Sequence, residues 1–151
     1  MSTAMTTAEL IEVRKRKIAG LFERIITNDE LALADEIFAE DFYWPQFDLR
    51  GPDGVRAWVR AFRTTFPDVS DMVQEQVAEG DVVISRVKVI GTQLGPFRGL
   101  PATGKRVEFE ALGFDRFRGD MVVERSAWFD MADLMRKLGH RTLTLPEVPA
   151  P

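Results

Sequence analysis

The stretch 105–139 constrains the fold of this chain more than any other, because it contains two long segments of alternating side chains. Alternation with a period of two over eight or more residues is typical of half-buried strands, and both 105–117 and 121–129 show it. Gly119 and Asp120 stand between the two segments and suit a tight turn. The stretch therefore predicts an antiparallel pair of long strands.

A helix is expected directly after the second strand. Asp130 is a suitable N-cap, because its carboxylate can accept a hydrogen bond from a backbone N–H of the first turn. Gly139 stands where a C-terminal cap belongs. Between them, four apolar residues recur at helical spacing and form one stripe: Met131, Leu134, Met135 and Leu138.

The rest of the chain predicts three more helices and three more strands. The helices are expected over 8–27, 28–41 and 51–67, and the strands over 42–47, 72–78 and 82–90. Helices gathered on one face of a strongly bent antiparallel sheet form an α+β fold. We expect a cone-shaped α+β barrel, in which the helices close the concave face around a pocket for a small molecule.

Length and composition indicate one domain over 8–140, with a disordered N-terminus at 1–7 and a Pro-rich C-terminal tail at 141–151. The net charge of −4 does not indicate a nucleic-acid-binding protein, so the basic run 14–17 is interpreted as a solvated side of a helix. With no Cys and one His, neither disulfides nor a soft metal site are expected. No long apolar run is present, which predicts a cytoplasmic protein without a membrane span.

Six short motifs, in order along residues 10–139, resemble the SnoaL-like polyketide cyclases of the nuclear-transport-factor-2-like superfamily. They are DFYWP at 41–45, FPD at 66–68, EGDVV at 79–83, GTQLG at 91–95, PATGK at 101–105 and the segment 124–139. The resemblance implies the cone fold, usually as an oligomer. It also implies an aromatic polyketide as substrate, because the family's cyclases close such rings by intramolecular aldol chemistry. These cyclases use neither a metal nor an organic cofactor, so none is expected here.

The sequence departs from the family where the cyclases place their catalytic groups. Their acid/base aspartate precedes the helix-capping aspartate by three positions, and this chain has Ala127 there. Their histidine on the preceding strand corresponds to Gly113, and the histidine of their Gly-Thr-His motif corresponds to Gln93. An alanine cannot give or take a proton. The resemblance therefore predicts a site that has lost the usual carboxylate and the imidazoles near it.

Strand alternation identifies the side chains that would line the cone. If Ala127 points inward, so do Arg125, Val123 and Phe129, and the partner strand directs Phe109, Ala111, Gly113 and Asp115 to the same side. A charge facing an apolar interior must be paired or must bind something, so Arg125 either pairs with Asp115 and meets the substrate or reaches the solvated rim. Gly113 and Ala127 either serve only the packing of the core or leave a wider pocket where the cyclases have their catalytic side chains.

Ten residues are the candidates for the site. Asp130 is either a plain helix cap or a catalytic acid, and Trp44 is placed to stack on a flat ring. The catalytic candidates are Arg125, Asp115 and Asp130, and the substrate-binding candidates are Trp44, Gln93, Phe109, Ala111, Gly113, Ala127 and Phe129.

Four functions follow from these residues. The first is a cofactor-independent tailoring enzyme of anthracycline-like antibiotic biosynthesis that hydroxylates an aromatic polyketide, as some relatives in such pathways are thought to do. The second is an aldol cyclase whose acid/base has moved to Asp115 or Asp130. The third is a binding module without chemistry. The fourth is epoxide hydrolysis, which needs an Asp-Arg-Asp arrangement such as Asp115, Arg125 and Asp130.

The outward face of the two long strands predicts self-association. It carries large apolar residues beside acids that have possible cross-strand partners in Arg86 and Lys88. A sheet face this apolar is rarely left to water, so a homodimer packed sheet against sheet is expected. The apolar residues are Leu112, Phe114, Val122 and Trp128, and the acids are Glu108, Glu110 and Glu124.

Overall fold

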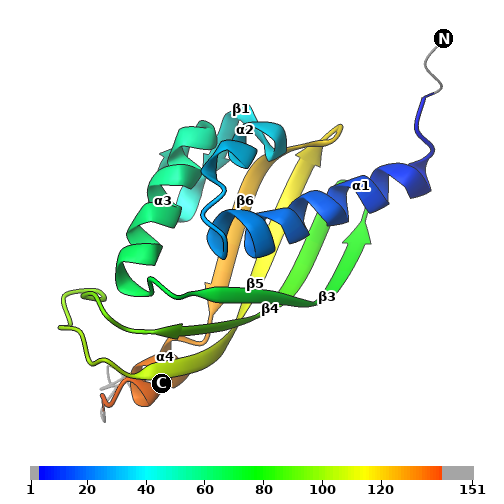
Figure 1. Cartoon of the computed structure of the whole chain (residues 1–151). Coiled ribbons are helices and arrows are strands. Elements are labelled where there is room, and N and C mark those ends of the chain that lie inside the picture. The colour runs from blue at the N-terminus through cyan, green and yellow to red at the C-terminus, as the bar shows by residue number, and fades with distance from the viewer. Residues whose placement is uncertain (1–3, 141–151) are drawn as a thin grey trace, which may run out of the picture.

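A six-stranded sheet with helices on its concave side is the framework of the molecule in the computed structural model, which describes residues 4–140 (Figure 1). The strand order is β2-β1-β6-β5-β4-β3. The expected tail 141–151 lies outside the described residues. The strands are β1 (Phe38–Trp44), β2 (Leu49–Arg50), β3 (Ser70–Glu79), β4 (Val82–Thr92), β5 (Arg106–Arg118) and β6 (Met121–Phe129).

The predicted α+β class is confirmed, with one correction to the sheet. Strands β3 to β6 form the expected antiparallel meander, but β1 pairs with β6 in parallel, so the sheet is mixed and does not close into a barrel. The Gln46 side chain continues this parallel pairing beyond the end of β1. Its Oε1 accepts from the backbone N–H of Ala127 at 2.7 Å, and its Nε2 donates to the Ala127 carbonyl at 3.0 Å.

The helices are α1 (Thr7–Gly20), which continues as a π-helical turn η1 (Leu21–Ile26), α2 (Ala34–Ile37), α3 (Gly51–Thr65) and α4 (Met131–Lys137). The helix predicted over 28–41 is confirmed in its middle, where a 3-10 turn at Leu31–Leu33 leads into α2. It is wrong at its end, because the chain is extended from Phe38 onward and Phe38 and Phe42 fill the core from a strand. The prediction of disorder over 1–7 is also wrong at its end, because Thr6 caps α1 through a capping box with Glu9.

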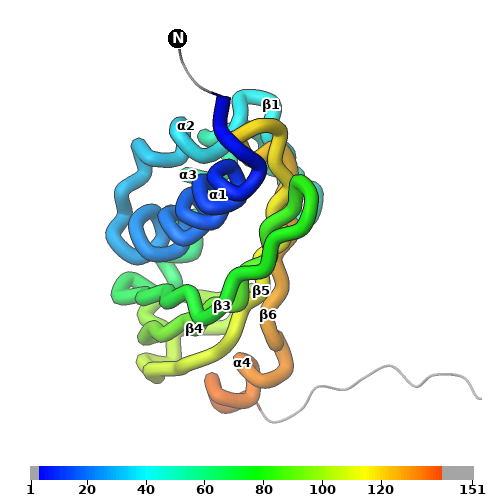
Figure 2. Tube along the Cα trace, turned by 90° about the vertical axis from the view of Figure 1, so that its right-hand side faces the viewer, coloured from blue at the N-terminus to red at the C-terminus, as the bar shows by residue number. Residues whose placement is uncertain are grey.

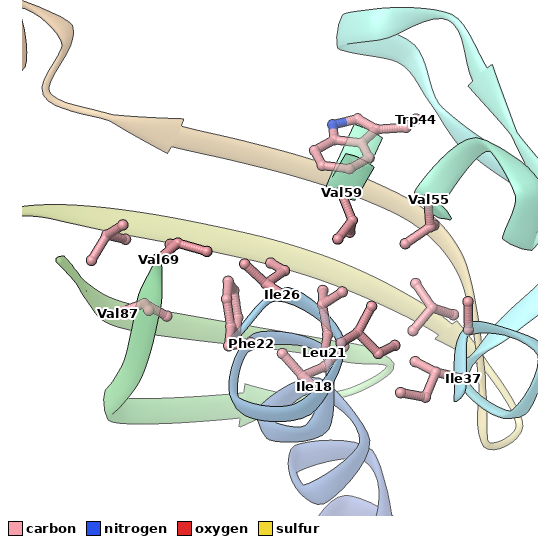
Figure 3. Packing of buried hydrophobic residues seen from close by; sticks show 14 of the residues in the cluster. Ile18, Leu21, Phe22, Ile26, Ile37, Trp44, Val55, Val59, Val69 and Val87 are labelled. Carbon is pink, nitrogen blue, oxygen red and sulfur yellow. The ribbon is translucent and has the colours of Figure 1, made fainter. Parts of the chain in front are cut away.

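The first helix lies across the hollow of the sheet and supplies the centre of the core. Figure 2 shows the sheet from its edge, curving around α1. Apolar side chains of this helix and its π-helical turn project toward the strands (Figure 3). Five of the residues are almost fully buried: Ile18, Leu21, Phe22, Ile25 and Ile26. Because α1 spans the sheet, it determines how deep the hollow between sheet and helices can be.

The basic run 14–17 was predicted to be a solvated side of the helix, and this prediction is wrong for two of its residues. The Arg14 side chain is only 9% exposed, and its guanidinium donates to the carbonyls of Gly119 at 2.8 Å and Gly80 at 3.1 Å. Lys17 donates to the carbonyl of Asp120 at 2.7 Å. Both hairpin turns end beside α1 and offer unpaired carbonyls there, so these cations tie the turns to the helix.

The convex face matches the prediction in its charges and differs at one apolar residue. Arg86 pairs with Glu110 at 2.9 Å and Lys88 with Glu108 at 3.1 Å, as expected across neighbouring strands. Val122, expected to face outward, is fully buried, and Val123, expected to face inward, is only half-buried. The register of β5 and β6 shifts next to Phe117, which opposes Val122, and this bulge reverses the alternation before Arg125.

Candidate functional site

A cavity lies between the concave face of the sheet and the helices, and aromatic side chains form most of its wall. The unfilled space, including its open mouth, is about 620 Å³, of which about 50 Å³ admits the centre of a water-sized sphere. The space is therefore a narrow slot, and a flat multi-ring ligand enters only if side chains at the mouth move aside. The aromatic lining includes Phe22, Trp44, Trp58, Phe62, Phe109 and Phe129.

Ring contacts within this wall suit a planar ligand. The Trp44 and Trp58 rings have centroids 5.1 Å apart, and Trp58 stacks on Phe62 at 4.9 Å with only 9° between the planes. Phe109 and Phe129 meet at 5.6 Å on the strand side. Flat apolar surfaces of this kind favour offset stacking with another aromatic system.

Arg125 is buried at this cavity and does not reach the rim. It is 3% exposed, and its Nη1 donates to both carboxylate oxygens of Asp115 at 2.6 and 2.7 Å, which confirms the expected pairing. Its guanidinium carbon lies 5.1 Å from the ring centre of Phe22 and 5.2 Å from that of Trp44, within cation–π range. Its Nε has no hydrogen-bond partner among residues 4–140. The cation therefore keeps unused donor capacity.

Gly113 provides room for that cation. A Cβ built on Gly113 would lie 3.0 Å from Nη2 of Arg125 and 3.2 Å from Cζ of Phe22. The missing side chain is thus filled by the guanidinium and does not widen the pocket. Ala127, the cross-strand partner of Gly113, does line the cavity.

Asp71 is a second ionisable residue in the cavity wall, and the sequence analysis missed it. It is 5% exposed, and its Oδ1 has no hydrogen-bond partner in the part of the chain that the structure describes. Burial raises the pKa of the Asp71 carboxyl to about 7, although the positive charge of Arg125 acts in the opposite direction. Burial also raises the pKa of Asp115, against the charge and the hydrogen bonds of Arg125.

Asp71 was missed because the strand predicted over 72–78 began two residues too late. Strand β3 starts at Ser70, and extending its alternation back from Val73 by two positions directs Asp71 to the inner face. The backbone N–H of Asp71 donates to the Thr27 hydroxyl at 2.8 Å, and that hydroxyl donates to the Phe22 carbonyl at 2.9 Å. These bonds fix the start of β3 against the π-helical turn, so Asp71 has a defined position.

Some of the remaining residues predicted for the site line the cavity, and others lie outside it. Asp115 lies behind Arg125 and does not line the cavity. Gln93 is buried in loop contacts, where its Oε1 accepts from the Thr103 hydroxyl at 2.7 Å. Asp130 caps α4 by accepting from the backbone N–H of Asp133 at 2.9 Å. The predicted residues that line the cavity are Trp44, Phe109, Ala111, Arg125, Ala127 and Phe129.

The chemistry available at this site is acid–base and electrostatic. Among the described residues whose side chains line the cavity, Asp71 and Arg125 are the only ionisable ones. A carboxyl with a pKa near 7 can exchange a proton at neutral pH, and a fixed cation in an apolar wall can stabilise an oxyanion. Within residues 4–140 no three His, Cys, Asp or Glu side chains are grouped to hold a metal ion. No helix described there is long and apolar enough to cross a membrane.

Solved structures with the same fold include three from Streptomyces. TsrD from Streptomyces laurentii superposes with a TM-score of 0.77 at 22% identity, over 91% of this chain and 100% of its own. AclR, a candidate hydroxylase from Streptomyces galilaeus, gives a TM-score of 0.72 at 27% identity, over 93% and 86%. IdmH, a candidate polyketide cyclase from Streptomyces antibioticus, gives 0.71 at 27% identity, over 83% and 98%.

Sequence comparison places the chain within a family. No curated protein matches it in a sequence search. The model of the SnoaL-like polyketide cyclases matches residues 16–138, which is most of the chain. The match spans every strand of the sheet and both ionisable residues of the cavity wall. This protein therefore belongs to the SnoaL-like polyketide cyclase family.

Proposed function

We propose that this protein is a cofactor-independent enzyme of aromatic polyketide biosynthesis that prepares its substrate for ring hydroxylation. The observation that carries the proposal is the buried Arg125 guanidinium, which lies in an aromatic slot with donor capacity left over. A polyphenol or enolisable polyketide ring would stack in the slot and place its oxygen beside the cation. A polyketide substrate is in keeping with the family, and hydroxylation with the candidate hydroxylase AclR. The pathway would be that of an anthracycline-like antibiotic.

The protein's part in hydroxylation is to form and protect an electron-rich anion. Loss of a proton from the ring leaves an electron pair that the carbonyl or phenolic oxygen shares, and Arg125 stabilises the charge on that oxygen. Dioxygen then adds at the carbon and gives a hydroperoxide. Two electrons from a separate reductant and two protons cleave the O–O bond, leaving the ring hydroxyl and releasing water. Exclusion of bulk water by the aromatic wall strengthens the electrostatic contact.

Aldol cyclisation is the second candidate, and Asp71 is the observation that favours it. A cyclase needs an acid/base group, and Ala127 cannot supply one. Asp115 is held by two hydrogen bonds from Arg125 and Asp130 caps a helix, so neither is free for that role. Asp71 is free, and its pKa of about 7 suits proton transfer.

Substitution of Ala127 by Asp separates these candidates. If the protein cyclises by aldol chemistry, Ala127→Asp should restore the family's usual carboxylate and raise the rate of ring closure on an uncyclised polyketide ester. If it is not a cyclase, the variant should give no ring closure and should lose native activity, because an additional buried carboxylate disturbs Arg125. Ala127→Ser is the control for size. Robust ring closure by the unmodified protein would overturn hydroxylation as the first choice.

The convex sheet face is the proposed interface of a homodimer. Large apolar side chains on it are solvent-exposed, among them Ile84 at 38%, Leu112 at 46% and Trp128 at 53%. Sedimentation at micromolar concentration should give the mass of a dimer. Ile84→Glu should weaken association at least tenfold, because burying an unpaired carboxylate costs more than about 1.4 kcal/mol. A monomeric mass for the unmodified protein would refute the interface.

A further inference from the structure

Asp71 is the one acidic group of the cavity wall that no protein contact uses. Its Oδ1 is buried and unpaired within the described part of the chain, although buried carboxyl oxygens normally have partners. Keeping such a group costs stability, so a role outside the fold itself would explain it. The two other acids considered for the site are both held by protein contacts, Asp115 by Arg125 and Asp130 by the backbone of α4.

The curvature of the sheet brings Asp71 and Arg125 to one cavity. Asp71 lies at the start of β3, at one edge of the sheet, whereas Arg125 lies on β6, with β5 and β4 between them in strand order. Because the sheet curves around the first helix (Figure 2), both side chains line the same slot. The position of Asp71 is fixed from the helix side by the Thr27 hydroxyl, at 2.8 Å from its backbone N–H.

We infer that Asp71 is the catalytic base, and that it removes a proton from an enolisable carbon of an aromatic ketone held in the slot. This inference rests on the proposed function and adds the group that performs its first step. The C–H bond breaks, an O–H bond forms on Asp71, and the electron pair of the C–H bond moves to the ketone oxygen. Arg125 receives the resulting oxyanion, so the unpaired acceptor and the unused donor capacity both find a partner in the ligand.

The charges around Asp71 suit this step. Within residues 4–140, Arg125 on β6 is the only cation that lines the cavity, and Asp115 on β5 lies behind it. The cavity-lining residues of the π-helical turn and of α3 are all apolar. Proton transfer moves one negative charge from Asp71 to the ligand within reach of the same cation, so the cavity gains no net charge. The raised pKa of Asp71 also makes it a stronger base than an ordinary carboxylate at neutral pH.

Hydrogen–deuterium exchange tests this step without oxygen or reductant. Anthrone, a three-ring ketone with an enolisable C–H, would be incubated with the protein in D₂O under nitrogen, and its deuterium content followed by mass spectrometry. The unmodified protein should accelerate exchange, and Asp71→Asn should lower that acceleration by about 10²–10⁴-fold. Glu75→Gln removes an exposed carboxylate from the same strand and should leave the rate unchanged.

Binding and pH dependence complete the test. Quenching of tryptophan fluorescence should show that Asp71→Asn still binds anthrone, since the aromatic wall is intact. In the unmodified protein the exchange rate should rise with pH through about 7, as the Asp71 carboxyl ionises, and this limb should be absent in Asp71→Asn. Equal exchange rates in the two proteins would overturn the role of Asp71 alone. Failure of the unmodified protein to bind anthrone would overturn the proposed function together with it.

Discussion

Replacing Arg125 by Met should destabilise the protein by about 3–5 kcal/mol, because the change leaves the Asp115 carboxylate buried without its partner. Asp115 is fully buried, and both of its oxygens accept hydrogen bonds from Arg125. Methionine keeps an unbranched apolar side chain at this position, but it is shorter and lacks the guanidinium group with its charge and donors. Urea unfolding monitored by tryptophan fluorescence would measure the loss in free energy of unfolding.

Two further variants separate the ion pair from general effects of losing an arginine. Arg118 pairs with Asp41 at the surface, with two hydrogen bonds of 2.9 and 2.8 Å, and because solvent screens this exposed pair, Arg118→Met should change the free energy of unfolding only slightly. The double variant Arg125→Met, Asp115→Leu replaces the buried pair by apolar groups and should recover most of the stability. It should still lack activity, because the oxyanion contact is gone. A loss for Arg125→Met as small as that for Arg118→Met would contradict the buried pair.

Replacing Asp71 by Asn should stabilise the protein at alkaline pH. The pKa of Asp71 rises from its ordinary value of 3.8 to about 7 in the folded state. Between these pH values the folded state binds more protons than the unfolded state, so stability falls as pH rises from about 4 to about 7. Above pH 7 the folded protein carries the whole cost of a buried carboxylate. Asp71→Asn removes that cost and should gain roughly 2–4 kcal/mol at pH 8.

The pH profile of this gain is more informative than its size. Near pH 3 the two proteins should have nearly equal stability, since Asp71 is neutral in the folded state and mostly neutral in the unfolded one. Asp68→Asn is a control of opposite sign, because hydrogen bonds from Thr92 lower the pKa of Asp68, and its ionised form stabilises the fold at neutral pH. A constant or negative effect of Asp71→Asn across this range would show that the carboxyl titrates normally. A gain in stability with a loss of activity is typical of a residue kept for function.

The local pattern of the sequence was enough to predict strands β5 and β6, which line the cavity. Alternation over β5 and β6 identified Arg125 and Asp115 as inward neighbours, and they are cross-strand partners in the structure. Alternation fixes the side of a strand on which a residue lies, and that is why this pair was found. The cap role of Asp130 followed from its position before an apolar helical stripe, which is equally local.

Features that depend on distant segments were not predictable in the same way. The parallel pairing of β1 with β6 joins residues about eighty positions apart, and nothing in the segment around Phe38 signals that partner. Apolar residues of 28–41 also fit a helical stripe, so the pairing with β6 decided between helix and strand. The burial of Arg14 depends on two turns whose carbonyls meet only in the folded chain. Asp71 would have been identified as an inward residue if the predicted start of β3 had been one residue earlier.

Oxygen labelling tests the proposed hydroxylation most directly. An aromatic polyketide with an unsubstituted ring position would be incubated with the protein and ascorbate under ¹⁸O₂, and in parallel under nitrogen, and the products compared by mass spectrometry. We expect a product that carries one labelled hydroxyl oxygen, forms only under oxygen, and is lost with Asp71→Asn. A product without label that forms equally well under nitrogen, or no product at all, would contradict it.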